Sequence, residues 1–102
     1  MTPTEFRALL HGNIEDLFVL VADRNENYGG TDPLRCWRKR GLGGLIVRFE
    51  DKLHRFEAFL ESGATEEQWR ELLFDIGGYA LCGLVWLASG EPDEHVKREG
   101  QT

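Results

Sequence analysis

A single carboxylate lies in the most apolar stretch of this sequence. Residues 72–90 contain Asp75 and no other charged residue. An isolated charge in such surroundings is costly, so this carboxylate must be paired with a cation, bind a metal ion, or stay protonated. Asp75 is therefore either a functional group or a structural carboxylate that pairs with a nearby basic residue. The basic candidates are Arg48, Lys52 and Arg55.

A dense block of charged residues precedes this stretch. Residues 48–55 read Arg-Phe-Glu-Asp-Lys-Leu-His-Arg. The acidic residues that could share one site on two neighbouring helices are Glu50, Asp51, Glu71 and Asp75. Carboxylate oxygens are ligands that Mg²⁺ prefers, and the ion keeps several waters for phosphates. We therefore expect a Mg²⁺ site, in which Asp51 and Asp75 are the catalytic carboxylates and the metal activates a water.

The same acidic residues also allow a purely structural interpretation. Asp51 lies three residues after Arg48 and four before Arg55, which is the spacing of an exposed ion-pair ladder on a helix. Ladders of this kind contribute little stability. Under this interpretation Glu50 and Glu71 are solvated side chains without a ligand.

Basic and aromatic side chains supply candidates for binding a phosphorylated ligand. The ligand-binding candidates are Tyr28, Arg38, Arg48, Lys52, Arg55 and Tyr79. Arginine and lysine bind phosphate oxygens through charge-assisted hydrogen bonds. A tyrosine ring can stack on a base, and its hydroxyl can bond to a phosphate or a sugar. The alternatives are that Tyr79 belongs to the core and that the basic run around Arg38 is a solvated face.

Composition restricts the class of protein. A chain of 102 residues, 41% hydrophobic and 29% charged, fits one small globular domain. Its net charge of −6 argues against a dedicated DNA or RNA binder. The two cysteines form no CxxC motif, and the uncharged run 76–88 is shorter than the roughly 20 residues of a spanning helix. We expect a cytoplasmic protein with reduced thiols and no membrane partner.

Hydrophobic periodicity predicts an all-α fold, a small bundle of three long helices and one short helix. We expect the long helices over about residues 3–25, 44–62 and 66–89, and the short helix after Asp32-Pro33. Capping boxes are expected at Thr2 with Glu5 and at Thr65 with Gln68. One seam of the bundle would consist of Ile46, Phe49, Leu53, Phe56 and Leu60, spaced three and four apart. Residues 1–90 form a single helical domain in this prediction, and residues 91–102 form a flexible tail.

Three glycines interrupt the predicted C-terminal helix. Gly77, Gly78 and Gly83 each cost about 1 kcal/mol relative to alanine in a helix. Close approach of another helix would compensate for this cost, and the apolar surface of residues 76–88 exceeds what a small monomer can cover. We therefore predict a homo-oligomer, a dimer in the simplest case, that forms through this helix.

Three segments in this order resemble a known pattern. They are Asn-Glu-Asn-Tyr-Gly-Gly at 25–30, the charged block at 48–55, and Asp-Ile-Gly-Gly-Tyr-Ala at 75–80. Together they resemble the nucleotide modification associated domain 1 family, which is common in phages and bacteria. They are also similar, more distantly, to the all-α nucleotide pyrophosphatases of the MazG and dimeric dUTPase type.

The resemblance implies a helical oligomer that binds nucleotides. In the pyrophosphatases, acidic residues on two adjacent helices hold Mg²⁺ against the phosphates, and the matching positions are Glu50, Asp51, Glu71 and Asp75. This chain departs from the ExxE motif of those enzymes, because Glu50 and Asp51 are adjacent and the other two are four apart.

Three functions follow as hypotheses. The first is a Mg²⁺-dependent nucleotide pyrophosphohydrolase in the cytoplasm, or in the host cytoplasm if a phage encodes the chain. The second is a non-catalytic protein that sequesters nucleotides, including cyclic ones. The third is a helical protein-interaction module.

Overall fold

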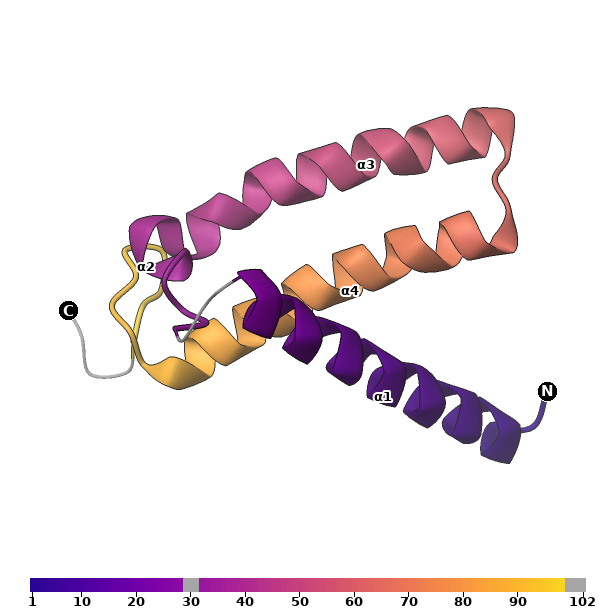
Figure 1. Cartoon of the computed structure of the whole chain (residues 1–102), viewed down its shortest axis with the longest axis horizontal. Helices are drawn as coiled ribbons and strands as arrows, with labels where there is room; N and C mark the ends of the chain where they lie inside the picture. The colour runs from indigo at the N-terminus through magenta and orange to yellow at the C-terminus, as the bar shows by residue number, and fades with distance from the viewer. Residues whose placement is uncertain (29–31, 99–102) are drawn as a thin grey trace. The chain divides into compact units, whose positions relative to one another are not determined.

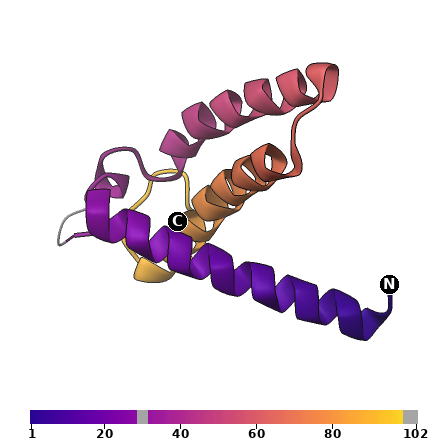
Figure 2. The ribbon, with the colours of Figure 1, turned by 45° about the vertical axis from the view of Figure 1, so that its right-hand side comes forward.

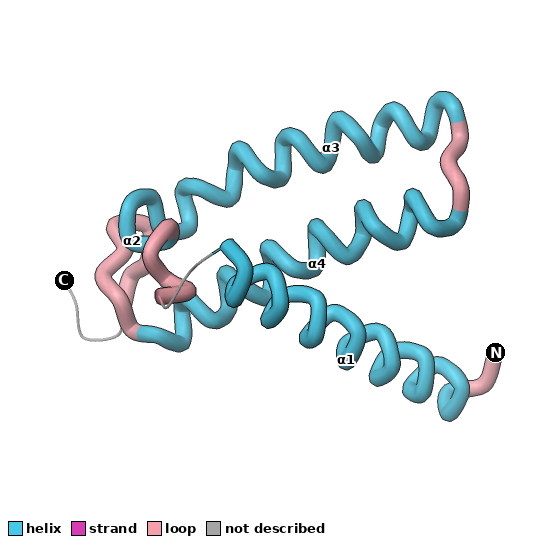
Figure 3. Tube along the Cα trace, in the orientation of Figure 1, coloured by secondary structure: helices cyan, strands magenta, loops and turns pink. Residues whose placement is uncertain are grey.

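The computed structural model describes residues 1–28 and 32–98, with the backbone alone for residues 26–28. All regular structure within these ranges is helical, which confirms the all-α prediction (Figure 3). The chain divides into two compact units, residues 1–33 and residues 34–102. Each unit is described by itself below.

The first unit contains one long helix, α1, which spans Pro3–Tyr28. The predicted capping box is present, since the Thr2 amide donates to Glu5 Oε2 at 3.2 Å and the Glu5 amide donates to Thr2 Oγ1 at 3.1 Å. Both bonds satisfy amides that a helix start leaves without partners. The helix continues three residues beyond the predicted end, because Asn25 to Tyr28 contain neither proline nor glycine.

The second unit contains a helical hairpin preceded by two short turns of helix. Its elements are α2 (Trp37–Arg40), the 3₁₀ helix η1 (Gly41–Gly44), α3 (Leu45–Ser62) and α4 (Glu66–Ser89). Three residues connect α3 to α4, and the two helices run side by side in opposite directions (Figures 1 and 2). The expected short helix begins at Trp37 rather than directly after Pro33, because residues 33–36 form turns.

The connection between α3 and α4 has the chemistry that its sequence predicts. Gly63 ends α3 with a positive φ of 76°, a conformation that glycine adopts without a Cβ penalty. Thr65 then caps α4, with its hydroxyl accepting from the Gln68 amide at 3.1 Å and its own amide donating to Gln68 Oε1 at 2.9 Å. The predicted bounds of α4 are confirmed, because both the capping box and the C-terminal Gly90 are in place.

Aromatic residues hold the two ends of the hairpin. Near the connection, Phe56 and Phe59 each meet Trp69 edge to face, at centroid distances of 5.2 and 5.3 Å. At the other end, Trp37 stacks on the fully buried Trp86 at 6.0 Å. The contacts of Trp69 therefore hold α3 against α4, and the contact of Trp37 holds α2 against the end of α4.

The predicted seam of α3 is divided between two environments. Phe49 and Phe56 are partly buried, while Ile46, Leu53 and Leu60 are 63%, 56% and 65% exposed. The exposed three recur every seven residues and so form one line along α3. Phe49 and Phe56 therefore pack in the hairpin, and the line of Ile46, Leu53 and Leu60 is not covered by the other elements of the hairpin unit.

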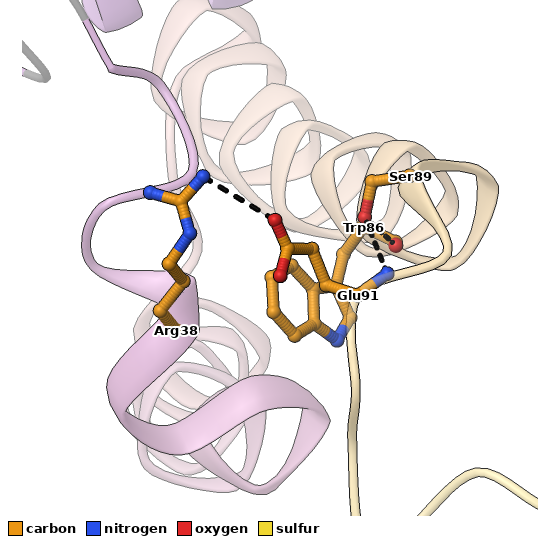
Figure 4. Close-up of polar contacts among 4 residues, drawn as sticks. All are labelled: Arg38, Trp86, Ser89 and Glu91. Carbon is orange, nitrogen blue, oxygen red and sulfur yellow. Dashed lines mark hydrogen bonds and ion pairs between the residues drawn. The ribbon is translucent and has the colours of Figure 1, made fainter.

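The residues after α4 return to α2 and η1. Arg38 forms an ion pair with Glu91 at 3.3 Å, and the Glu91 amide donates to Ser89 Oγ at 3.3 Å (Figure 4). Asp93 accepts hydrogen bonds from the Leu42 amide at 2.9 Å and from Trp86 Nε1 at 2.7 Å. These are ordered contacts in a segment for which the sequence indicated a flexible tail.

Asp93 lies in an environment that favours its charged form. Hydrogen bonds from the backbone amides of Leu42 and His95, and then from the Trp86 indole, lower its pKa below the ordinary value of 3.8. The three donors favour the charged carboxylate. The negative charge therefore helps to fix η1 and the end of α4 together.

Candidate functional site

Two contacts between α3 and α4 bring together four residues that the sequence singled out. Lys52 Nζ lies 3.3 Å from Asp75 Oδ2, and the Arg48 guanidinium lies 5.9 Å from the centroid of the Tyr79 ring. Arg48 and Lys52 are four apart on α3, and Asp75 and Tyr79 are four apart on α4. Because the helices are antiparallel, the two contacts form consecutive steps of one ladder. We call these four residues the α3–α4 cluster.

The Lys52–Asp75 pair is largely shielded from solvent. The side chains are 11% and 17% exposed, respectively. The sequence offered three basic partners for Asp75, and the structure pairs it with Lys52. The carboxylate that is isolated within its own helix therefore finds its cation on the neighbouring helix.

Asp51 approaches the same lysine from the solvent side. Its Oδ2 lies 3.6 Å from Lys52 Nζ, and its side chain is 67% exposed. Lys52 thus bridges one nearly buried carboxylate and one exposed carboxylate. The ammonium is a compact charge with three donors, which suits such a bridge.

Two further predicted residues share the face of the α3–α4 cluster. Arg55 lies three residues after Lys52 on α3, and Glu71 lies four residues before Asp75 on α4. Helical periodicity therefore puts Arg55 on the same face of α3 as Lys52, and Glu71 on the same face of α4 as Asp75. Both side chains are exposed.

Other predicted residues do not join this face. Glu50 is two residues before Lys52, which is a rotation of about 200° around a helix of 3.6 residues per turn, and it is exposed. Arg38 pairs with Glu91 beyond the end of α4. The side chain of Tyr28 lies outside the described residues.

The predicted magnesium ligands are not gathered into one group. Within residues 1–28 and 32–98, no three acidic, histidine or cysteine side chains are placed so that they could hold a metal ion. Asp51 and Asp75 both contact Lys52, whereas Glu50 lies on the far side of α3. The donor set therefore fits an ammonium better than it fits Mg²⁺, which requires near-ideal octahedral oxygen coordination.

The sequence interpretation missed Asp93. It follows Gly90 and Pro92, both typical of a helix end, so it was assigned to the polar tail. A specific signal was available in Trp86, whose indole N–H usually needs a hydrogen-bond acceptor when the ring is buried. Asp93 supplies that acceptor seven residues later.

Helix α4 has a second property that bears on where the protein works. Among the described helices it is the one that is long and apolar enough to cross a membrane, as judged by length and composition. The uncharged run 76–88, which we considered too short to span, is part of this longer helix. The core helix of a soluble protein has the same features, so the property is weak support for a membrane location.

Comparisons with known proteins provide no family assignment. No protein-family model matches the chain, and neither the curated proteins nor the solved structures include a match. The resemblance described above thus rests on the three quoted segments alone.

Proposed function

We propose that this protein binds a nucleotide at the α3–α4 cluster. The observation that supports the proposal is the ladder of Lys52–Asp75 and Arg48–Tyr79. It brings together, on one face, residues from the segments 48–55 and 75–80, which are two of the three segments that carry the family resemblance. Arg48 and Arg55 would contact phosphate oxygens. Tyr79 would contact the base or the sugar.

The Lys52–Asp75 pair also supports a functional role on energetic grounds. Removing two charges from water costs several kcal/mol per ion, and the attraction between them often fails to repay that cost. Replacement of a buried ion pair by well-packed apolar residues is often neutral or stabilising. An ion pair at this depth is therefore better explained by a ligand that uses its charges than by stability.

The proposal has two forms, which differ in the chemistry at this face. In one form the nucleotide is hydrolysed with Mg²⁺, and Asp51 and Asp75 are catalytic. In the other form the nucleotide, linear or cyclic, is held without reaction. The contact of Lys52 with both carboxylates favours holding over hydrolysis, because each carboxylate is already engaged.

A nucleotide panel distinguishes these forms. The purified protein is incubated with linear and cyclic nucleotides, with and without Mg²⁺, and the solution is analysed by mass spectrometry before and after heat denaturation. Intact nucleotide that returns only after denaturation supports holding, and a product that Asp75→Asn abolishes supports hydrolysis. Asp23→Asn, an exposed carboxylate on α1, is the matched control. If no nucleotide is depleted under any condition, the proposal is wrong.

A second candidate function is self-association into a helical assembly. The observation that favours it is burial: the hydrophobic side chains that the described chain buries fully are Leu72 and Trp86. Apolar side chains more than half exposed on α3 and α4 are Ile46, Val47, Leu53, Leu60, Leu73, Leu84 and Val85. A second copy of the chain would cover part of this surface. In this proposal the oligomer works in the cytoplasm and does not have a nucleic acid as its partner.

A further inference from the structure

The position of Lys52 has a consequence for the cation requirement of the α3–α4 cluster. Its ammonium lies 3.3 Å from Asp75 Oδ2 and 3.6 Å from Asp51 Oδ2. A divalent metal that used these two carboxylates would have to displace the ammonium. The lysine side chain is only 11% exposed, so the displaced ammonium would have to move out from between the two helices to reach solvent.

The other acidic residues nearby do not complete a metal site around this lysine. Glu50 lies on the opposite side of α3, and Glu71 is exposed one turn before Asp75. Magnesium dehydrates reluctantly and binds oxygens at about 2.0–2.1 Å in an octahedron. Two carboxylates that already share one ammonium are a poor starting point for that geometry.

We propose that Lys52 is the resident cation of the α3–α4 cluster, and that a phosphate-bearing ligand binds there without a divalent metal. The ligand part of this statement rests on the proposed function. Asp75 and Asp51 form ion pairs with this ammonium at 3.3 and 3.6 Å and so hold its charge at the cluster. An ammonium has three donors that rotate freely, so it would also contact a phosphate oxygen of the ligand. Arg48 and Arg55 provide further positive charge on the same face.

Metal binding tests the first part of the proposal without any nucleotide. Mn²⁺ is titrated into the apo protein, and the free ion is followed by electron paramagnetic resonance. The wild-type protein should show no site tighter than about 1 mM, which corresponds to roughly 4 kcal/mol. One Mn²⁺ per chain bound at micromolar concentration, and lost in Asp75→Asn, would overturn the proposal.

Removal of the ammonium should make the two carboxylates attract a divalent cation more strongly than they do in the wild-type protein. Lys52→Met keeps an unbranched apolar side chain and leaves two carboxylates without their shared cation. Loss of one positive charge so close to the carboxylates should tighten Mn²⁺ binding by about tenfold or more. Lys39→Met, at an exposed lysine of α2, should leave Mn²⁺ binding unchanged. Equal Mn²⁺ affinity in wild type and Lys52→Met, with helical content retained, contradicts the proposal.

A nucleotide-binding experiment tests the second part of the proposal, which is that the ligand binds without a divalent metal. Retention of the panel nucleotides by the wild-type protein is compared in excess EDTA and in excess Mg²⁺, and we expect it to be equal. The Lys52→Met variant should lose this retention under both conditions. Retention that requires Mg²⁺ overturns the metal-independent site. If no nucleotide is retained but the Mn²⁺ results hold, nucleotide binding is wrong and the resident cation stands. If Lys52→Met does not fold, the wild-type titration and the EDTA comparison decide.

Discussion

At the residue scale, the proposed nucleotide site depends on the pair of Lys52 and Asp75. A carboxylate removed from a nearly buried pair leaves an ammonium that has lost both its water and its main partner. Sequence alone indicated that Asp75 needs a partner, because it is isolated in an apolar run. It could not indicate which of three basic residues provides it, since that depends on the register between two helices.

Asp75→Asn should lower the free energy of unfolding by about 2 kcal/mol, because the largely shielded ammonium of Lys52 loses a charged acceptor. Urea denaturation followed by circular dichroism measures the change. Asp51→Asn is the control, since this carboxylate is 67% exposed and a surface pair contributes about 0–1 kcal/mol. Equal effects of the two substitutions would show that the pair is not shielded as described.

Asp93 should give the protein an acid-sensitive contact. Its folded pKa lies below the ordinary 3.8, so its contribution to stability is present above that value. The contribution is lost as the pH falls through the lowered pKa, because protonation removes the charged acceptor from Leu42, His95 and Trp86. Unfolding curves between pH 5 and pH 2 should therefore show a steeper loss of stability for wild type than for Asp93→Asn. Parallel curves would contradict this role.

At the element scale, local signals predicted α1, α3 and α4 well. Two capping boxes, Gly63 and Gly90 mark their ends with chemistry that acts within a few residues. The short helix was harder to predict, because residues 33–44 contain turns and a 3₁₀ helix whose positions depend on the contact with Asp93. The placement of the predicted magnesium ligands also depends on helix rotation, which separates Glu50 from Lys52.

Two glycines provide a matched test of these elements. Gly41 has a φ of 55°, and a Cβ at this position would lie against the Asp93 carboxylate, so Gly41→Ala should destabilise by more than about 1 kcal/mol. Gly12 lies in α1 with nothing within 4 Å of an added Cβ, so Gly12→Ala should stabilise that helix by up to about 1 kcal/mol. Thermal unfolding monitored by circular dichroism measures both. A neutral Gly41→Ala would contradict the described contact.

At the scale of the whole molecule, each face of the hairpin has its own character. The α3–α4 cluster lies on one side, together with Arg55 and Glu71. Helical periodicity places two apolar lines on the other side, Ile46, Leu53 and Leu60 on α3 and Leu73 and Leu84 on α4. Complete burial of five such side chains removes about 300–600 Å² from water, at 1.5–3 kcal/mol per side chain and 25 cal/mol per Å². These five are 53–65% exposed, so about 180–350 Å² of that area is still available. A standard interface hides about 800 Å² per partner, so this face supplies about a quarter to just under a half of one.

The chain should therefore self-associate at micromolar concentration. Sedimentation equilibrium should give a mass above the 11.7 kDa of one chain, and Leu84→Glu should shift it towards the monomer because a charge would enter the interface. Glu67→Gln, an exposed position on the same helix, should leave the mass unchanged. A wild-type monomer would contradict the assembly, and partition of the protein into lipid vesicles would assign α4 to a membrane instead.

Nuclear magnetic resonance can test most directly whether the α3–α4 cluster is where a nucleotide binds. The ¹⁵N-labelled protein is titrated with the nucleotide that the panel retains, and amide shifts are mapped onto the sequence. The account predicts that the largest shifts fall at Arg48, Lys52, Asp75 and Tyr79, with saturation in EDTA. Shifts confined to α1, or spread evenly over the chain while these four amides stay in place, would contradict it.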